Sequence, residues 1–436
     1  MSEPMTMLFM PESAYGPTNN CIGIGNILRG RGHHVVFAAE ASWEGKLAAL
    51  GFTEDLVSLS APPPVDAPGQ DPGQFWKDFI RDTAPEFRKP TIEQLATFIR
   101  PTWEALIDGA RYSHEQLTAI VARHRPDIVI EDNVNCFPAL LTAGAPFCRI
   151  ASCNPLEVGG PNLPPVFSGY PIEDRAGWEE FRAEYDRTHR DLWAAYDEWV
   201  QACGAPPLPD LEFIHEGDLN LYVYPEALDY TDVRPLGSTW HRLPSSVRAT
   251  DAPFAIPDAL GDGPGKLIYL SLGSLGSADV DLMRRLVSVL ASSPHRFIVS
   301  KGPQHDQYEL APNMWGAEQV PQISLLPQVD LVITHGGNNT VTECIHFGKP
   351  MIVLPLFWDQ YDNAQRVHET GFGVRLATYD FSAVELHGAI ERLLGDSSLQ
   401  ARLATASAAV QAQRGTEIAA DLIEATARSG AAGPRR

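Results

Sequence analysis

Thirty residues in the second half of the chain, Leu331 to Gln360, hold its densest set of side chains that could do chemistry. They begin with His335-Gly336-Gly337-Asn338-Asn339-Thr340, continue to Glu343 and end on Asp359-Gln360. The two glycines let backbone N–H groups approach a ligand closely. A glycine turn that exposes several backbone N–H groups is suited to binding an anion such as a phosphate.

The elements around this turn predict that it lies at the edge of a parallel sheet. Residues 331–333 are apolar and mostly β-branched, which predicts a buried strand, and residues 351–356 predict the next one. Asn and Thr are helix N-cap types, so we expect a helix over 341–347 that ends at Gly348-Lys349-Pro350. Unpaired N–H groups and the positive helix end then face one point, at the edge where open α/β sheets bind ligands.

This stretch resembles the nucleotide-sugar signature of the UDP-dependent glycosyltransferase superfamily with the GT-B fold, in particular its bacterial natural-product and macrolide members. The matching pattern is His-x-Gly-x-Asn-Thr, a glutamate three residues later, and Asp-Gln after the next strand. The resemblance implies that His335 and the Asn339-Thr340 turn contact the diphosphate. It also implies that Glu343 binds the ribose hydroxyls and that Asp359-Gln360 binds the sugar hydroxyls. An ordinary βαβ crossover would leave these last residues as coincidences.

Two more segments of the second half resemble donor-binding parts of the family. Residues 266–272 predict a strand that leads into Gly273-Ser274-Leu275-Gly276-Ser277 and a helix over 280–290, and Ser274 would approach the diphosphate. Val320-Pro321-Gln322 resembles the base-binding turn, with Gln322 near the uracil, but Gln319 stands where the family often has Trp. The residues expected to bind the donor are Gly273, Ser274, Gln322, His335, Gly337, Asn338, Asn339, Thr340, Glu343, Asp359 and Gln360.

Composition excludes several classes of partner. The 436 residues carry a net charge of −22 at pH 7, which repels nucleic-acid phosphates and anionic lipid, so neither partner is expected. The six cysteines show no Cys-x-x-Cys spacing, and the first residues show no secretory pattern, so we expect a cytoplasmic protein with reduced thiols. The resemblance implies no metal and no cofactor, with a nucleotide sugar, first of all UDP-glucose, as co-substrate. A monomer or a homodimer is expected.

The fold class predicted is α/β, with two Rossmann-like domains that face each other across a cleft. We expect an N-terminal acceptor-binding domain over 1–245, a linker over 246–265 and a C-terminal donor-binding domain over 266–415. By family resemblance, a last helix over 416–430 returns to the first domain.

Within the first domain, a strand over 5–10, a loop over 11–20 and a helix over 21–28 are predicted. Gly23-Ile24-Gly25 lies inside that helix pattern, so an NAD-binding turn is rejected. The Pro/Gly-rich loop over 154–171 and a helix over 178–203 are expected to wall the acceptor pocket.

The sequence departs from the family at the position of the general base. Family members commonly place a His in the loop after the first strand, oriented by an Asp at the end of a later strand. Asp132 matches the Asp, but Pro17 stands at the His position. Asp132 could instead cap the helix near Phe137. The catalytic candidates are therefore Asp132, Asn19 and His335.

Three interpretations of the catalytic site remain open. Asp132 or Glu12 acts as the base, directly or through water; or the acceptor ionises easily; or the protein binds a nucleotide sugar without transferring it. The function predicted is an inverting, metal-independent glycosyltransferase that moves a hexose to a small apolar acceptor such as a phenol, polyketide or macrolide. A nucleotide-sugar 2-epimerase and a non-catalytic, partner-activating protein are the alternatives.

Overall fold

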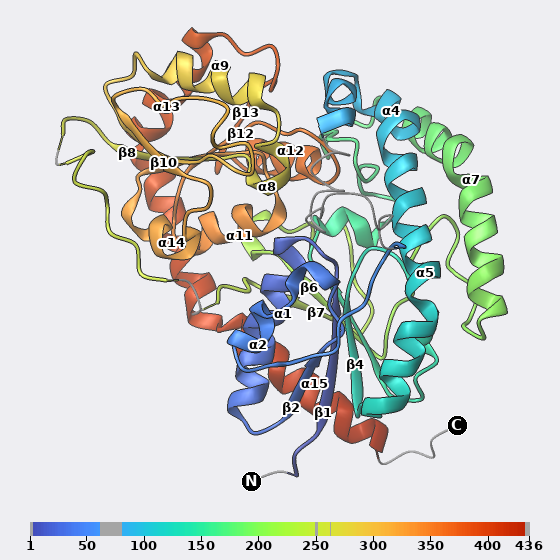
Figure 1. Ribbon diagram of the computed structural model, residues 1–436. Coiled ribbons are helices and arrows are strands. Elements are labelled where there is room, and N and C mark those ends of the chain that lie inside the picture. The colour runs from blue at the N-terminus through green and yellow to red at the C-terminus, as the bar shows by residue number, and fades with distance from the viewer. Residues whose placement is uncertain (1–2, 62–80, 249–251, 262, 432–436) are drawn as a thin grey trace, which may run out of the picture.

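Parallel β-strands of each half of the chain form a separate sheet in the computed structural model (Figure 1). The structure describes residues 3–61, 81–248, 252–261 and 263–431. Within these residues the first sheet has seven strands in the order β3-β2-β1-β4-β5-β6-β7, and the second has six in the order β10-β9-β8-β11-β12-β13. In both sheets the order reverses beside the first strand of the domain, which is where open α/β sheets bind ligands. The fold is GT-B: two α/β domains with Rossmann-like sheets.

The elements of the first domain run in alternation along the chain. Its strands are β1 (Thr6–Pro11), β2 (His34–Phe37), β3 (Thr53–Glu54), β4 (Ile128–Asp132), β5 (Phe147–Ala151), β6 (Leu219–Val223) and β7 (Trp240–Leu243). Its helices are α1 (Tyr15–Gly30), α2 (Lys46–Ala49), α4 (Thr91–Gln94), α5 (Arg100–His124), α6 (Pro138–Leu141) and α7 (Trp178–Ala202). Short 3₁₀ or π segments are η1 (Ala41–Trp43), η2 (Ala84–Arg88), η3 (Leu95–Ile99), η4 (Pro155–Val158) and η5 (Glu226–Leu228).

The second domain repeats the pattern. Its strands are β8 (Leu267–Ser271), β9 (Arg296–Ser300), β10 (Met314–Ala317), β11 (Leu331–Thr334), β12 (Met351–Val353) and β13 (Gly373–Arg375). Its helices are α8 (Gly273–Gly276), α9 (Val280–Leu290), α10 (Gln322–Leu325) with η6 (Leu326–Gln328), α11 (Asn338–His346), α12 (Gln360–Glu369), α13 (Ala383–Gly395) and α14 (Ser397–Gln413). The last helix, α15 (Gly415–Ala431), packs on α1 and on strands β4, β6 and β7 of the first domain (Figure 1).

Apolar residues alternate along the strands and build a core on each face of the first sheet. Ile128 and Ile130 of β4 pack with α1 and α15, whereas Val129 packs toward α5 and α7. Asp132 and Glu131 continue this alternation, so their side chains point to opposite faces of the sheet. No helix among the described residues is long and apolar enough to cross a membrane.

Two predicted helix starts are wrong, and both errors lie near the cleft. The segment 11–20 is not all loop, because α1 begins at Tyr15 and takes Pro17 into its first turn, where the missing N–H of a proline costs nothing. Helix α11 begins at Asn338 and not at 341, with Gly337 as its N-cap. Strand β7 is an element that the sequence pattern did not predict. The sequence also predicts a Pro/Gly-rich loop over 61–73 and a helix over 75–99, and both lie partly outside the described residues.

Candidate active site

The predicted phosphate turn connects β11 to α11. Gly336 has φ +91°, and a Cβ there would lie 2.6 Å from Val353 Cγ1, so only glycine fits. Among the described residues no side chain caps the start of α11, because Asn338 and Asn339 are already helical and direct their amides elsewhere. The first-turn N–H groups of this nine-residue helix therefore remain for a ligand, at its positive end.

His335 lies between two glycines of the donor side. A Cβ on Gly273 would approach the imidazole ring to 2.8 Å, and one on Gly337 would approach it to 2.6 Å, so both must lack a side chain. Burial lowers the pKa of His335 to about 4, although a hydrogen bond to the Ser271 carbonyl partly offsets this. At neutral pH the imidazole is uncharged, so it offers a hydrogen bond rather than a positive charge. Ser274 lies in the single turn α8, next to Gly273.

Glu343 and Gln322 lie together, as a shared nucleoside site requires. The buried Glu343 carboxylate accepts a hydrogen bond from the Gln322 side-chain amide, and that amide also lies 3.2 Å from Thr340 Oγ1. Arg248 of the linker reaches the same carboxylate, with 3.5 Å between Nη1 and Oε1. Gln319 donates to the Tyr15 hydroxyl of α1 at 3.4 Å, so the position that often holds Trp contacts the opposite domain.

Asp359 and Gln360 lie past β12, where a sugar would meet the first domain. Asp359 Oδ2 accepts a hydrogen bond from Asn154 N at 2.8 Å and another from Asn363 Nδ2 at 3.2 Å. Burial raises the pKa of Asp359 to about 7, in spite of the hydrogen bond from Asn154. Gln360 Oε1 accepts from the backbone of Leu356 at 3.1 Å, which holds the loop before α12. Asp359 and Gln360, at the start of α12, are called the sugar corner below, and the loop over residues 154–171 is called the acceptor-side loop. Asp359 therefore connects the sugar corner to the acceptor-side loop.

Asp132 is a buried carboxyl at the end of β4 in the first domain. It is 2% exposed, the Ser152 hydroxyl donates to its Oδ1, and Cys21 Sγ lies 3.9 Å from its Oδ2. Burial, with smaller contributions from nearby Glu157 and Glu12, raises its pKa to about 8, against the hydrogen bonds from Ser152 and Asn20. No side chain among the described residues caps α6, so the helix-cap interpretation of Asp132 is wrong.

Asn20, and not Asn19, is the asparagine that contacts Asp132. Asn20 is 1% exposed, and its Nδ2 also donates to Asn339 Oδ1 of the phosphate turn at 3.2 Å. The Ser246 hydroxyl of the linker donates to Asn20 Oδ1. One side chain therefore connects the candidate base to the donor turn. The signal that could have found it is helical spacing: in a helix that begins at Tyr15, Asn20 lies one turn after Pro17 on the same face.

The other carboxyls near Asp132 are already engaged or point away from it. Glu12 accepts from Ala14 N at 2.8 Å and from Ser13 Oγ at 2.9 Å, at the start of α1. Burial raises its pKa. Glu131 is fully buried on the opposite face, with neither oxygen hydrogen-bonded within the described part of the chain, and burial raises its pKa well above the usual range. Both carboxyls are thus poorly placed as bases.

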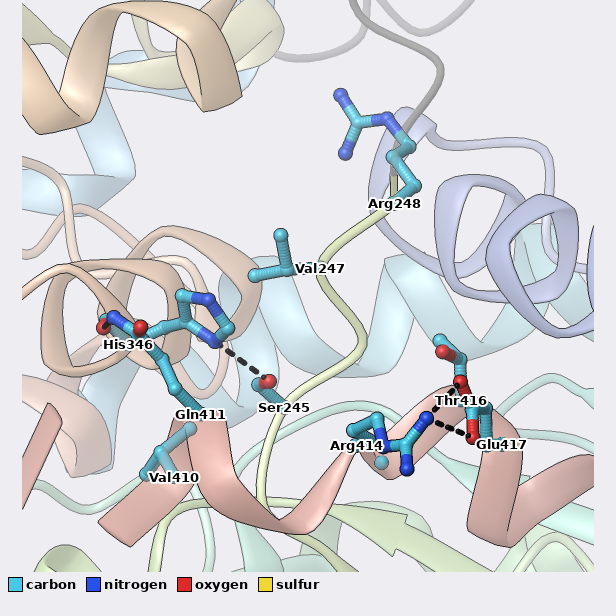
Figure 2. Close-up of a pocket in the computed structure, with 10 residues that line it drawn as sticks. Ser245, Val247, Arg248, His346, Val410, Gln411, Arg414, Thr416 and Glu417 are labelled. Atoms are coloured by element: carbon cyan, nitrogen blue, oxygen red, sulfur yellow. Dashed lines mark hydrogen bonds and ion pairs between the residues drawn. The ribbon is translucent and has the colours of Figure 1, made fainter. Parts of the chain in front are cut away.

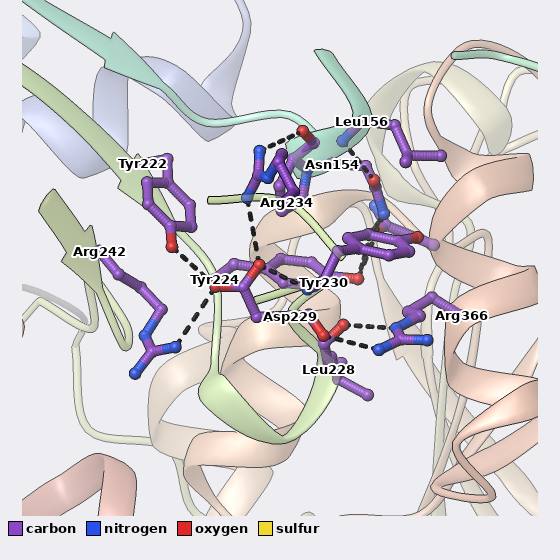
Figure 3. Close-up of polar contacts among 12 residues, drawn as sticks. Asn154, Leu156, Tyr222, Tyr224, Leu228, Asp229, Tyr230, Arg234, Arg242 and Arg366 are labelled. Atoms are coloured by element: carbon purple, nitrogen blue, oxygen red, sulfur yellow. Dashed lines mark hydrogen bonds and ion pairs between the residues drawn. The ribbon is translucent and has the colours of Figure 1, made fainter. Parts of the chain in front are cut away.

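Hydrogen bonds connect the two domains beside the candidate site. Arg366 of α12 donates from Nε to Leu228 O and from Nη2 to Asp229 O, both at 2.6 Å, and lies 4.4 Å from the Tyr230 ring centroid (Figure 3). The Asp229 carboxylate is the centre of a buried polar cluster that accepts hydrogen bonds from Tyr222, Arg234 and Arg242. The domain arrangement therefore rests on charge-assisted hydrogen bonds as well as on apolar packing.

A cavity of about 300 Å³ lies at the hinge, apart from the phosphate turn (Figure 2). Its lining comes from the linker, from the end of α11 and from the α14–α15 junction, and includes Ser245, Arg248, His346, Gln411 and Arg414. His346 Nδ1 lies 3.0 Å from Ser245 Oγ, and Arg414 pairs with Glu417. Because it adjoins the negative end of α11, this cavity does not serve the anion site at the other end.

Fold and site together define a class: enzymes that hold a nucleoside diphosphate at the helix end of one Rossmann-like domain and a second substrate in the other. The comparisons with known proteins agree. The family model of UDP-glucoronosyl and UDP-glucosyl transferases matches residues 260–413. The oleandomycin glycosyltransferase of Streptomyces antibioticus is 27% identical over 432 residues, which is 97% of this chain and 91% of that relative.

Solved structures show the same fold over nearly the whole chain. The glycotransferase of kitacinnamycin is 22% identical with a TM-score of 0.72, and the match covers 98% of this chain and 100% of that one. The glycosyltransferase VinC, solved in complex with dTDP, is 19% identical with a TM-score of 0.65, over 97% and 100%. Residues 260–413 therefore match the domain of that family, and the relatives and structural neighbours support the UDP-dependent glycosyltransferase superfamily.

Proposed function

We propose that the protein transfers a sugar from a nucleoside diphosphate sugar to a hydroxyl of a small apolar natural product, by a single displacement that inverts the anomeric carbon. The carrying observation is the connection Asp132–Asn20–Asn339, which places the buried carboxyl of β4 one side chain away from the phosphate turn. Support for the acceptor class comes from the similarity to the oleandomycin glycosyltransferase.

The donor side would stabilise the leaving group. As the bond from the anomeric carbon to the diphosphate breaks, negative charge grows on the phosphate oxygens. The first-turn N–H groups of α11 and the positive end of that helix meet this charge, and His335 adds a hydrogen bond. Asp359 and Gln360 would hold the sugar hydroxyls. This assignment uses only residues of the chain, and no metal ion takes part in the proposed step.

On the acceptor side, Asp132 would take the proton of the acceptor hydroxyl as that oxygen bonds to the anomeric carbon. A pKa of about 8 makes Asp132 a stronger base than an ordinary carboxylate once it is ionised, which partly replaces the absent histidine. The cost is that most Asp132 side chains carry a proton at pH 7. An acceptor that ionises easily, such as a phenol, needs less help and is the acceptor type we expect to react fastest.

UDP-glucose is the first donor to test, and dTDP-sugars are the second candidate. Glu343, which accepts a hydrogen bond from Gln322, would bind the ribose hydroxyls of a uridine nucleotide, and the similarity to the family model supports this choice. The similarity to VinC, solved with dTDP, favours the alternative. Calorimetry with UDP and dTDP, with the same enzyme preparation, decides between them. A tenfold or larger difference in Kd between UDP and dTDP, about 1.4 kcal/mol in binding free energy, would identify the nucleobase of the donor.

A panel of nucleotide sugars and aglycones with mass-spectrometric detection tests the proposal. Transfer to at least one phenolic or polyketide acceptor, with loss in the Asp132→Asn variant, is the expected result. A change of the donor sugar in the absence of any acceptor would indicate a 2-epimerase instead. Tight binding of the nucleotide without turnover across the whole panel would indicate a non-catalytic protein.

A further inference from the structure

Two aromatic residues with unusual backbone conformations touch each other across the domain interface. Phe167 has φ +70° and Trp358 has φ +56°, and they are two of the five non-glycine residues with positive φ in the described part of the chain. Their ring centroids lie 4.5 Å apart. Left-handed backbone is unfavourable for aromatic residues and persists only where surrounding contacts hold it, which is common near functional sites.

Each ring is held from the other domain. The Trp358 indole, which belongs to the second domain, lies 5.2 Å from Trp103 of α5 as well as against Phe167. Phe167 N, from the acceptor-side loop of the first domain, donates to Asp362 Oδ2 of α12 at 2.7 Å, and Gly169 N donates to Oδ1 at 2.8 Å. Asp362 is 1% exposed, so these are buried hydrogen bonds. The pair is therefore a contact built by both domains.

This contact ends directly at the sugar corner. Trp358 is the residue before Asp359, and Asp359 Oδ2 accepts the N–H of Asn154, which opens the loop that also carries Phe167. Any shift of the Trp358 backbone moves the Asp359 carboxylate, because one peptide unit separates them. The acceptor-side loop and the sugar-binding carboxylate are thus connected twice, once through Asn154 and once through the aromatic pair.

We propose that Trp358, with Phe167 as its partner, is a positioning residue that sets Asp359 against the donor sugar and keeps water from replacing the acceptor. This rests on the function proposed above. Both reactions break the bond between the anomeric carbon and the diphosphate oxygen. Transfer places the acceptor oxygen on that carbon, whereas hydrolysis places a water oxygen there and releases free sugar, nucleoside diphosphate and a proton. A closed aromatic pair excludes water from the acceptor-side loop and so favours transfer.

The test compares Trp358→Gly, Trp358→Phe and Phe167→Gly with the wild-type protein. Glycine accepts a positive φ freely and removes the ring, whereas phenylalanine keeps both a ring and the strained backbone. The ratio of donor hydrolysis to acceptor transfer is expected to rise roughly tenfold or more in both glycine variants, since small misplacements cost large factors in rate. Trp358→Phe should restore the ratio to within about threefold of wild type, and nucleoside diphosphate affinity should change less than about twofold in all three.

Tyr361→Phe is the matched control. Tyr361 of α12 also reaches the first domain, since Gln94 Nε2 donates to its hydroxyl at 3.1 Å and the hydroxyl donates to Phe87 O at 3.3 Å. Losing this hydroxyl weakens the domain contact without touching the aromatic pair, so the hydrolysis-to-transfer ratio should stay at the wild-type value. A merely structural role for Trp358 would lower hydrolysis and transfer together and leave their ratio unchanged.

A double-mutant cycle completes the experiment. Phe167→Gly and Trp358→Gly combined should raise the ratio no more than the stronger single change, because the two rings act as one unit. Additive effects, or unchanged ratios in both glycine variants while wild type transfers sugar, would overturn this inference alone. A wild-type protein that transfers no sugar to any acceptor would overturn the proposed function as well. If Trp358→Gly does not fold, Phe167→Gly and Trp358→Phe give the same comparison.

Discussion

The two sides of the cleft handle charge in opposite ways. The donor side, around α11, uses backbone N–H groups, glycines and a neutral imidazole, which suit an incoming anion without any charged side chain on the turn. The acceptor side, around the end of β4, holds buried carboxyls whose pKa values are raised by burial, among them Asp132 and Glu131. Under the proposed function, this difference means that the donor side can bind in its resting state, whereas Asp132 on the acceptor side has to lose a proton before it can act as a base.

The largest expected effect comes from replacing Asp132 on the acceptor side. Asp132→Asn keeps the hydrogen bond with Ser152 possible but removes the basic oxygen, so kcat/KM for an alkyl alcohol acceptor should fall by about 10² to 10⁴. For the wild type, kcat/KM should rise with pH and level off above pH 8, because the ionised form is the active one. Steady-state kinetics across pH 6–9 measure both effects.

A phenol series sharpens this prediction. If the acceptor supplies its own ionisation, the loss in Asp132→Asn should shrink as the phenol becomes more acidic. An Asp132→Asn variant with wild-type turnover on alkyl alcohols would remove this carboxyl from the mechanism.

The second largest expected effect comes from replacing His335 on the donor side. His335→Ala should weaken use of the donor by roughly 10 to 10³ in kcat/KM, since one hydrogen bond to the developing charge on the diphosphate is lost. Folding should be little disturbed, because the imidazole is neutral and its burial carries no paired charge. Donor kinetics and thermal unfolding measure the two quantities separately. His346→Ala, at the hinge end of the same helix, is the control and should retain donor kinetics.

A smaller effect concerns the glycine turn itself. Gly336→Ala forces a Cβ into Val353 at a positive φ, so it should destabilise the second domain by about 1–3 kcal/mol and also displace the first-turn N–H groups of α11. Gly388→Ala is the matched control, because a Cβ there meets nothing within 4 Å and helix propensity favours alanine. In denaturant unfolding, the free energy of unfolding should fall in Gly336→Ala and rise in Gly388→Ala, relative to the wild type. Equal stabilities of the two variants would contradict the close packing of the turn.

The smallest effect is a dependence of stability on pH that arises near the cleft. Burial raises the pKa of Asp359 to about 7 and those of Asp132 and Asp362 to about 8, from 3.8. The native state therefore binds more protons than the unfolded state between pH 4 and pH 8, so stability should fall as pH rises through this window. The thermal midpoint should drop by several degrees from pH 5.5 to pH 8.5, and by less in Asp132→Asn. A midpoint that rises over this range would contradict the buried, protonated carboxyls.

How much could be predicted from the sequence differs between these two regions. The donor turn lies within one strand–turn–helix unit, so residue types and spacing along thirty positions indicated the glycines, the helix end and the neighbouring strand. The start of α11 was misplaced by three residues, because Gly337 replaces a side-chain cap there. The acceptor side brings together β1, α1, β4, β5 and the linker, which lie far apart in the sequence, and no local pattern could separate Asn20 from Asn19.

The sequence by itself determined the class of fold, the donor turn and the absence of a histidine at Pro17, since each is a property of residue type and short-range spacing. Only the tertiary structure decided that Asn20 joins Asp132 to the phosphate turn, that Asp359 binds the acceptor-side loop, and that Phe167 meets Trp358 across the interface. The physical reason is that burial and long-range contact set these properties. A carboxyl with a pKa near 8 is an ordinary aspartate in the sequence and becomes a candidate base only when the folded chain removes water from it.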